Sequence, residues 1–139
     1  MNTITSHDLW VLAQTIWGEA RGEGVEGMQA VCHVVCNRQR LHPTWRGRSI
    51  VAICQAPWQF SCWNLSDPNS PKLKKLNLSD AAFRLALQVA INGLADIEPD
   101  LTHGATHYYA DTLGTAPSWA RGHTPSAHIG HHLFFAGIA

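Results

Sequence analysis

The stretch LWVLAQTIWGEARGEGVEGMQAVCHVVCNRQR, residues 9–40, decides the fold of this 139-residue chain. Apolar side chains recur at helical spacing from Leu9 to Ile16, and Ser6 can cap that helix. Four glycines then fall within residues 18–27, which ends the helix and lets the backbone approach a neighbour closely. A second amphipathic helix is predicted from about Val25 to Arg40.

The rest of the chain predicts further helices and then extended segments. Ser49 caps a short helix through Cys54, and residues 55–71 predict an irregular loop rich in aromatic residues and proline. Ser79 and Asp80 cap a fourth helix, with Gly93 just beyond its end. After residue 95 the helical periodicity fades, and His107–Tyr109 and Ile129–Phe135 predict short strands. The expected fold is α+β, mainly helical, as a single domain over residues 1–139.

Composition excludes several classes of protein. Ten Lys and Arg balance ten Asp and Glu, so no basic field favours nucleic acid as a partner. No run of about 18 apolar residues exists, so no membrane insertion is expected. Residues 1–7 lack the basic and apolar parts of a signal peptide. The expected location is therefore the cytoplasm.

The four cysteines predict buried thiols. Two of them lie four apart within an apolar helical pattern, where free cysteine behaves as a small apolar side chain. A Cys54–Cys62 disulfide and a metal site are the alternatives. The set is Cys32, Cys36, Cys54 and Cys62.

Glu19 is the candidate for acid chemistry. It lies at a glycine-flanked helix end, in Ile16-Trp17-Gly18-Glu19-Ala20-Arg21-Gly22-Glu23. A glycosidase needs a carboxyl that can donate a proton near neutral pH, and an apolar pocket provides one by disfavouring the charged form. The alternative is a surface glutamate at a fraying helix terminus.

Four blocks in sequence order carry a resemblance to a known family. They are Gly18–Glu23 (GEARGE), Gly27–Arg38 (GMQAVCHVVCNR), Gln59–Ser61 (QFS), and the final block with Gly104-Ala105, Tyr108-Tyr109, Pro117-Ser118-Trp119 and Ile129–Phe134. In this order they resemble the bacterial cell-wall hydrolase family, which includes spore-cortex-lytic enzymes and phage lysins. The blocks extend over nearly the whole chain.

The resemblance implies a compact lysozyme-like domain that cuts peptidoglycan between N-acetylmuramic acid and N-acetylglucosamine. It implies that Glu19 is the catalytic acid and that no cofactor is needed. A lytic transglycosylase needs one carboxyl, which acts first as acid and then as base, whereas a muramidase needs a second carboxylate or a positioned water. Glu23, Glu26 and Asp111 are the candidates for a second carboxylate.

Seven further residues are candidates for binding the glycan. Aromatic faces suit sugar rings, and amide, hydroxyl and imidazole groups suit acetamido and hydroxyl groups, although each of these side chains could equally be structural. The candidates are Gln59, Phe60, Ser61, Tyr108, Tyr109, Trp119 and His132. The expected partner is peptidoglycan, bound by a monomer.

Other interpretations remain open. Six histidines between His103 and His132 would suit a zinc-dependent wall amidase or peptidase, although no HExxH pattern is present. A non-catalytic peptidoglycan-binding module is the third interpretation. Arg38, Arg40, Arg46 and Arg48 predict a solvated basic patch or a docking place for stem-peptide carboxylates. A phage endolysin, which waits in the host cytoplasm until a membrane pore releases it, is the expected biological setting.

Overall fold

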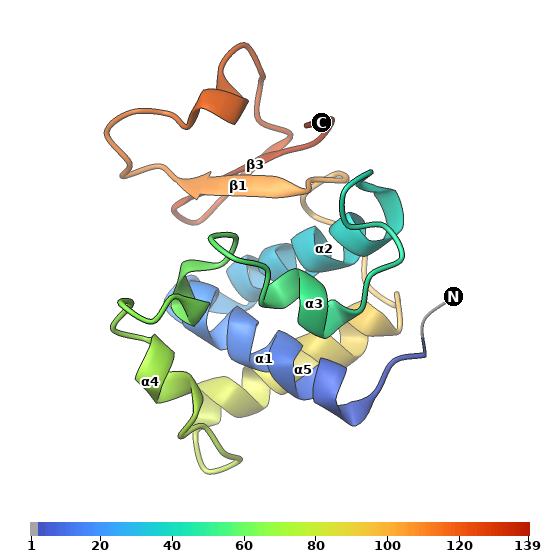
Figure 1. The fold of residues 1–139 in the computed structure, drawn as a ribbon, viewed down its shortest axis with the longest axis vertical. Coiled ribbons are helices and arrows are strands. Elements are labelled where there is room, and N and C mark those ends of the chain that lie inside the picture. The colour runs from blue at the N-terminus through green and yellow to red at the C-terminus, as the bar shows by residue number, and fades with distance from the viewer. Residues whose placement is uncertain (1–2) are drawn as a thin grey trace.

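Helices α1 (Ser6–Ala20), α2 (Gly24–Leu41) and α5 (Ala81–Leu94) pack against one another in a computed structural model that describes residues 3–139. A small sheet and its loops lie over this helical layer (Figure 1). Residues 1–2 of the N-terminal stretch lie outside the described residues. The α+β, mainly helical architecture predicted from the sequence is confirmed.

Helix α1 begins one residue earlier than expected, and its cap is Thr5 rather than Ser6. The Thr5 hydroxyl accepts a hydrogen bond from the backbone N–H of Asp8, and the Asp8 carboxylate accepts one from the backbone N–H of Thr5. This reciprocal capping box satisfies two N–H groups that the first helical turn leaves free. Asp8 also accepts from the backbone N–H of Val51, which joins the start of α1 to the next short helix.

Of the short helices, the sequence predicted the one after Ser49 but not the two that follow it. Helix α3 (Ile50–Cys54) is capped by the hydroxyl of Ser49, as expected. The loop after it contains a 3-10 turn, η1 (Ser61–Trp63), and a one-turn helix, α4 (Ser70–Leu73). Asp80 caps α5, also as expected.

Gly93 lies inside α5 and not beyond its end, which corrects the sequence-based prediction. A Cβ at this position would collide with the Sγ atom of Cys32 on α2. The glycine therefore serves the close crossing of α2 and α5 rather than the end of a helix.

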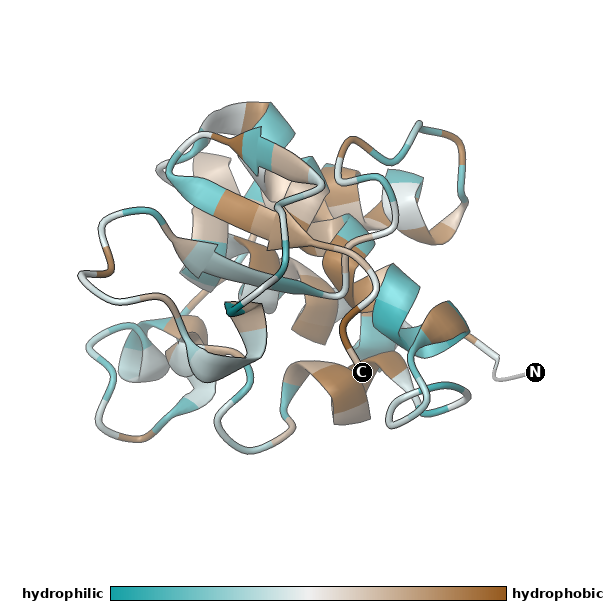
Figure 2. Ribbon diagram, turned by 90° about the horizontal axis from the view of Figure 1, so that it is seen from above, coloured by the Kyte–Doolittle hydropathy of each residue, from teal (hydrophilic) through white to brown (hydrophobic). Residues whose placement is uncertain are grey.

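Three antiparallel strands form the sheet in the order β1-β3-β2: β1 (His107–Ala110), β2 (Ala127–Ile129) and β3 (His132–Phe135). A second 3-10 turn, η2 (Ser118–Ala120), lies in the loop between β1 and β2. In the view from above, the strands lie over the helices (Figure 2). Tyr108 is opposite Phe134, and Tyr109 is opposite Leu133, so the two tyrosines point to opposite faces of the sheet.

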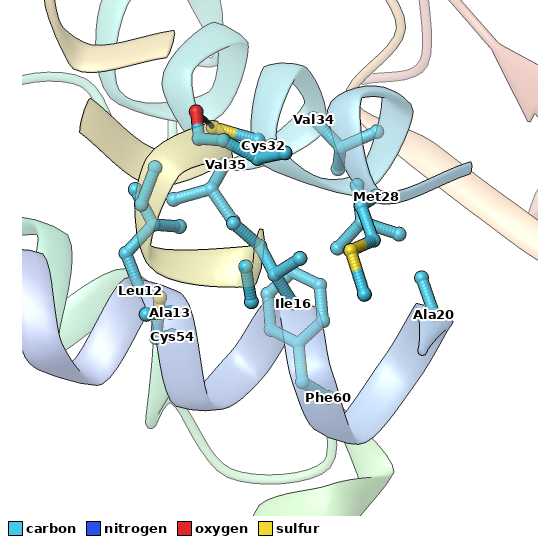
Figure 3. Close-up of a cluster of buried hydrophobic side chains, with 14 of the residues drawn as sticks. Leu12, Ala13, Ile16, Ala20, Met28, Cys32, Val34, Val35, Cys54 and Phe60 are labelled. Carbon is cyan, nitrogen blue, oxygen red and sulfur yellow. Dashed lines mark hydrogen bonds between the residues drawn. The ribbon is translucent and has the colours of Figure 1, made fainter. Parts of the chain in front are cut away.

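One large hydrophobic core lies between the helices and the inner face of the sheet. Figure 3 shows part of it, with side chains of α1 and α2 meeting Cys54 and Phe60. All four cysteines are buried and free, which confirms the prediction of core thiols. Among residues 3–139, no helix combines the length and the apolar character that a membrane crossing requires.

Candidate active site

Glu19 lies in the last turn of α1, half-buried, with both carboxylate oxygens engaged. The Tyr108 hydroxyl donates to Oε1 at 2.7 Å. The backbone N–H of Cys62 donates to Oε2 at 3.1 Å, and the Ser61 hydroxyl lies 3.5 Å from the same oxygen. Three elements that are distant in sequence (α1, η1 and β1) therefore converge on one carboxyl group.

Gly18 explains how η1 comes so close to α1. A Cβ on Gly18 would lie 2.6 Å from the Cβ and 2.8 Å from the Sγ of Cys62, distances that real side chains do not tolerate. The indole N–H of Trp63 donates to the Thr15 hydroxyl at 2.9 Å and fixes the other end of η1. Glu19 thus provides the carboxylate, and Gly18 leaves room for the backbone N–H of Cys62 that donates to it.

Tyr108 is held by aromatic neighbours on the inner face of the sheet. Its ring centroid lies 4.8 Å from that of His132 and 5.4 Å from that of Phe134. Burial, followed by the negative charge of Glu19, raises the pKa of the Tyr108 hydroxyl well above its usual value. The hydroxyl therefore stays protonated and remains a donor to Glu19.

Two polar side chains of α2 hold the segment that leads into β1. Asn37 donates to Asp100 at 2.8 Å and to the carbonyl of Ala105 at 2.9 Å. The Nε of Arg38 donates to the carbonyl of Thr106 at 2.7 Å. These bonds fix the start of the strand that carries Tyr108. The sequence pattern does not predict this role, because its one signal is a polar pair beside the buried stripe of a helix.

Arg38 corrects the predicted basic patch, because it is 4% exposed and does not lie on a solvated face. Its guanidinium lies 4.2 Å from the centroid of the Trp45 ring and 4.9 Å from that of Phe60. Burial lowers the pKa of Arg38 to about 10, so the group stays cationic at neutral pH. The other three arginines of the patch are exposed.

The thiol of Cys62 adjoins Glu19 but is poorly suited to nucleophilic chemistry. Burial, followed by the charge of Glu19 and a hydrogen bond to it, raises the pKa of this thiol far above its usual value. A thiolate is the reactive form of cysteine. The backbone N–H of Cys62, rather than its sulfur, is therefore the functional contribution of this residue.

The predicted glycan-binding residues fall into separate groups. Ser61, Tyr108 and His132 gather near Glu19, and burial lowers the pKa of His132 against the opposite pull of Glu23 and Glu19. Gln59 is exposed on the loop just before η1. The structure thus brings part of the predicted set together.

Phe60 was predicted to offer a face to sugar, and this prediction is wrong. Its ring is 1% exposed and lies among the buried side chains of α1 and α2 (Figure 3). No face remains for a ligand. Phe60 instead anchors the loop that carries Ser61 and Cys62.

Tyr109 and Trp119 lie on the opposite face of the sheet from Glu19. They pack with Phe135 in a second hydrophobic cluster. The ring centroid of Phe135 lies 5.6 Å from that of Tyr109 and 5.2 Å from that of Trp119. Trp119 also lies 4.9 Å from the ring of His107. The structure does not bring these two aromatic residues to the candidate site.

The other carboxylates have separate partners. Glu23 accepts a hydrogen bond from the backbone N–H of His131 at 3.1 Å, at the turn between β2 and β3. The Asp111 carboxylate lies 3.0 Å from Nε2 of His128 and 3.6 Å from Nδ1 of His131. Glu26 is exposed in the first turn of α2. Among the described residues, Glu19 is the one carboxylate that accepts hydrogen bonds from Ser61, Cys62 and Tyr108.

The C-terminal histidines do not gather at one place, although His128 and His131 share Asp111. His107 packs against His42 and Trp119 on the outer face, whereas His132 faces the inner side next to Tyr108. Over residues 3–139, no group of three or more His, Cys, Asp or Glu side chains is arranged to hold a metal ion. The donor set for zinc chemistry is therefore not assembled in this part of the chain.

The described residues form a small, mainly helical domain with one hydrogen-bonded carboxyl group at a helix end. The chain belongs to the Cell Wall Hydrolase family, whose sequence profile matches residues 22–135. Glu19 lies just before that range.

Two curated relatives extend the match. The chain is 30% identical over 130 residues to the spore cortex-lytic enzyme of Bacillus subtilis and 30% identical over 131 residues to that of Halalkalibacterium halodurans. Each alignment covers 94% of this chain and therefore includes position 19. The chain spans only 38% and 35% of the lengths of these two relatives.

Two solved structures share the fold. The catalytic domain of the SleB protein of Bacillus cereus superposes with a TM-score of 0.74 at 22% identity, covering 97% of this chain and 94% of that domain. The catalytic domain of the germination-specific lytic transglycosylase SleB of Bacillus anthracis superposes with a TM-score of 0.71 at 20% identity, covering 97% and 98%.

Proposed function

We propose that this protein is a peptidoglycan lytic transglycosylase in which Glu19 is the catalytic acid and base. The observation that carries the proposal is the single carboxylate held by the Tyr108 hydroxyl and the Cys62 N–H. Membership of the Cell Wall Hydrolase family, and relatives named spore cortex-lytic enzyme and lytic transglycosylase, support the same substrate and reaction.

The reaction requires one proton to be donated and one to be taken back. Glu19 in its acid form protonates the oxygen between N-acetylmuramic acid and N-acetylglucosamine, and the bond from that oxygen to C1 of the muramic sugar breaks. The Glu19 carboxylate then removes the proton from the C6 hydroxyl of the same sugar. The C6 oxygen bonds to C1, so a 1,6-anhydro ring forms without water.

The two oxygens of Glu19 have different hydrogen-bond donors. Oε1 accepts from Tyr108, whose ring packs against His132 and Phe134. Oε2 lies on the side of Ser61, which is exposed. We infer that Oε2, which lies beside the exposed Ser61, exchanges the proton with the glycan, while the Tyr108 hydroxyl and the Cys62 N–H keep the carboxyl group in place.

A muramidase mechanism has less support. It needs a second carboxylate or a positioned water on the opposite side of the sugar. Glu23 is bonded to the backbone at His131, and Asp111 is paired with His128 and His131. A mechanism that uses the same carboxyl twice matches the groups around Glu19.

Glu19→Gln tests the assignment. An amide cannot protonate the glycosidic oxygen, and general acid catalysis contributes about a hundred- to ten-thousandfold. The purified variant should keep the wild-type melting temperature and the ability to sediment with peptidoglycan, but should lose that factor in the rate of glycan cleavage. A rate of one tenth of wild type or better would contradict the assignment. Binding without turnover in the wild-type protein would support the non-catalytic module instead.

Mass spectrometry of the digest tests the reaction type. A lytic transglycosylase leaves muramic ends that are one water lighter than those left by a muramidase. Anhydro ends are expected throughout the digest. Reducing muramic ends as the main product would assign a muramidase, even with Glu19 essential.

Phage endolysin function, with the protein held in the host cytoplasm, stays a prediction from the sequence. Its test is production of the protein inside bacteria with and without a co-produced membrane pore. Lysis that needs both the pore and Glu19 is the expected result. Lysis without the pore would contradict retention in the cytoplasm.

A further inference from the structure

An apolar hollow lies in the loop that presents Ser61 and Cys62 to Glu19. It has a volume of about 540 Å³ and is lined by Pro57, Trp58, Asn64, Leu65 and Ser66. Trp58 is 79% exposed and Leu65 is 92% exposed. Two large apolar side chains on the surface of one short loop indicate a binding surface more than packing.

The backbone at Trp58 adds an independent observation. The N–H of Gln59 donates to the carbonyl of Ala56 at 3.2 Å, which closes a four-residue turn with Pro57 and Trp58 at its centre. Trp58 has a φ of 65°. The third position of such a turn takes a positive φ and is usually glycine. A tryptophan in the left-handed region is unfavourable for the fold, so its side chain is expected to have a use outside it.

The two tryptophans of this loop differ in a way that favours a ligand for Trp58. The indole N–H of Trp63 donates to Thr15, and its ring packs against the core. Within residues 3–139, no ring contact or hydrogen bond of the Trp58 side chain is present. Trp63 therefore fixes the loop, and Trp58 is presented to solvent.

The hollow is also near the candidate catalytic carboxyl. Trp58 is three residues before Ser61, so the Cα atoms of these two residues are no more than about 11 Å apart. Leu65 is three residues after Cys62, which donates to Glu19. The loop is therefore within reach of the sugars next to a glycosidic bond held at Glu19.

We propose that Trp58 and the hollow beside it form a saccharide subsite that binds a pyranose ring of the glycan strand next to the cleaved bond. The inference rests on the proposed function and extends it to a residue that sets affinity for the polymer. The indole offers a flat apolar face to the C–H groups of a sugar ring. The Asn64 amide and the Ser66 hydroxyl, which also line the hollow, can bond hydroxyl or acetamido groups.

The chemistry of the lining favours a neutral saccharide over a membrane. Peripheral membrane segments combine apolar side chains with Lys or Arg on the polar side, and the lining of the hollow contains neither. Specific ligand sites instead combine an apolar surface with a few polar groups that fix orientation, which is the composition found here.

The test measures binding in the Glu19→Gln chain, so that the glycan is not consumed. Trp58→Gly removes the ring and supplies the residue that the turn prefers, so its melting temperature should equal or exceed that of the parent. Its affinity for a peptidoglycan oligosaccharide long enough to reach the hollow should fall about tenfold, a change typical of the loss of one well-packed aromatic contact. Affinity for the disaccharide at the cleaved bond should change little.

Two further variants complete the experiment. Trp58→Phe keeps an aromatic face and should restore most of the affinity, although it keeps the unfavourable backbone. Ile97→Ala removes another large exposed apolar side chain, one that is 69% exposed and outside the hollow, and should leave affinity unchanged. Unchanged binding of the long oligosaccharide by Trp58→Gly would overturn the subsite.

Separate results identify the failure of each proposal. Loss of binding to phospholipid vesicles by Trp58→Gly, with binding to the oligosaccharide intact, would overturn the subsite in favour of a membrane contact. Intact glycan cleavage together with unchanged affinity of Trp58→Gly would overturn the subsite alone. Absence of glycan cleavage by the wild-type chain would overturn the proposed function, and binding by the Glu19→Gln chain still tests the subsite.

Discussion

The two faces of the small sheet have different functions, although neighbouring residues of the same strand form them. On the inner face, Tyr108 contacts Glu19 and packs against His132 and Phe134. On the outer face, Tyr109 packs with Trp119 and Phe135 in a separate hydrophobic cluster. The comparison teaches that an aromatic pair in a strand can place one residue in a site and the other in a structural cluster.

The largest expected effect is on stability and comes from the outer face. Phe135 is 2% exposed, and Phe135→Ala should lower the free energy of unfolding by about 3 to 5 kcal/mol. Because the ring points away from Glu19, the cleavage rate of the folded variant should stay within about twofold of wild type at a temperature well below its melting point. Urea unfolding and glycan-cleavage assays at that temperature measure the two quantities. A large loss of rate in the folded variant would break the separation of the two faces.

A matched pair of variants at the tyrosines should give the next largest effect. Tyr108→Phe removes a hydrogen bond to a charged group, which contributes about 1.5 to 3 kcal/mol, so the cleavage rate should fall roughly 10- to 100-fold. Tyr109→Phe removes only an outer hydroxyl and should leave the rate unchanged. Kinetics on soluble glycan strands measure both variants. Equal effects of the two substitutions would contradict the assignment of the faces.

The smallest effect concerns pH and compares two histidines. Burial, followed by the positive charge of Arg38, lowers the pKa of the outer-face His107 to about 4, from 6.5. Since the folded pKa is depressed, the unfolded chain binds the proton more readily. The contribution to stability is therefore complete above about pH 6.5 and is lost as pH falls towards 4. It should amount to about 1 kcal/mol, because the ring is only half-buried.

Variants at the two histidines sharpen this prediction. His107→Gln should flatten the fall in unfolding free energy between pH 6.5 and 4. His132→Gln, on the inner face, should flatten it less, because nearby carboxylates oppose the effect of burial on the pKa of His132. Urea unfolding at a series of pH values measures both slopes. An unchanged slope in His107→Gln would contradict the role of this ring.

Local patterns in the sequence were sufficient for most of the fold. Helical periodicity and the caps at Ser49 and Asp80 predicted the helices, since capping and amphipathic spacing act over a few residues. Gly93 was misplaced because its role depends on the Sγ atom of Cys32 on another helix. Such a close approach between distant elements leaves no local signal in the sequence.

The candidate site was predictable only in part, for the same reason. Glu19 and Tyr108 were identified through the family resemblance, but the choice between Tyr108 and Tyr109 depends on which face of the strand meets the helices. Phe60 was assigned to the wrong environment because an aromatic residue in a loop can be core or surface. The backbone N–H of Cys62 was missed because a main-chain donor has no sequence signature.

The hydrogen bonds of Glu19 also determine when during synthesis the site can form. The donors lie 42, 43 and 89 residues away along the chain, at Ser61, Cys62 and Tyr108. An N-terminal fragment that stops before β1 has the carboxyl group and the 3-10 turn but no hydroxyl to hold Oε1. A nascent chain therefore completes the hydrogen bonds of Glu19 only after β1 has been synthesised, and a truncated chain that ends before β1 lacks the Tyr108 hydroxyl.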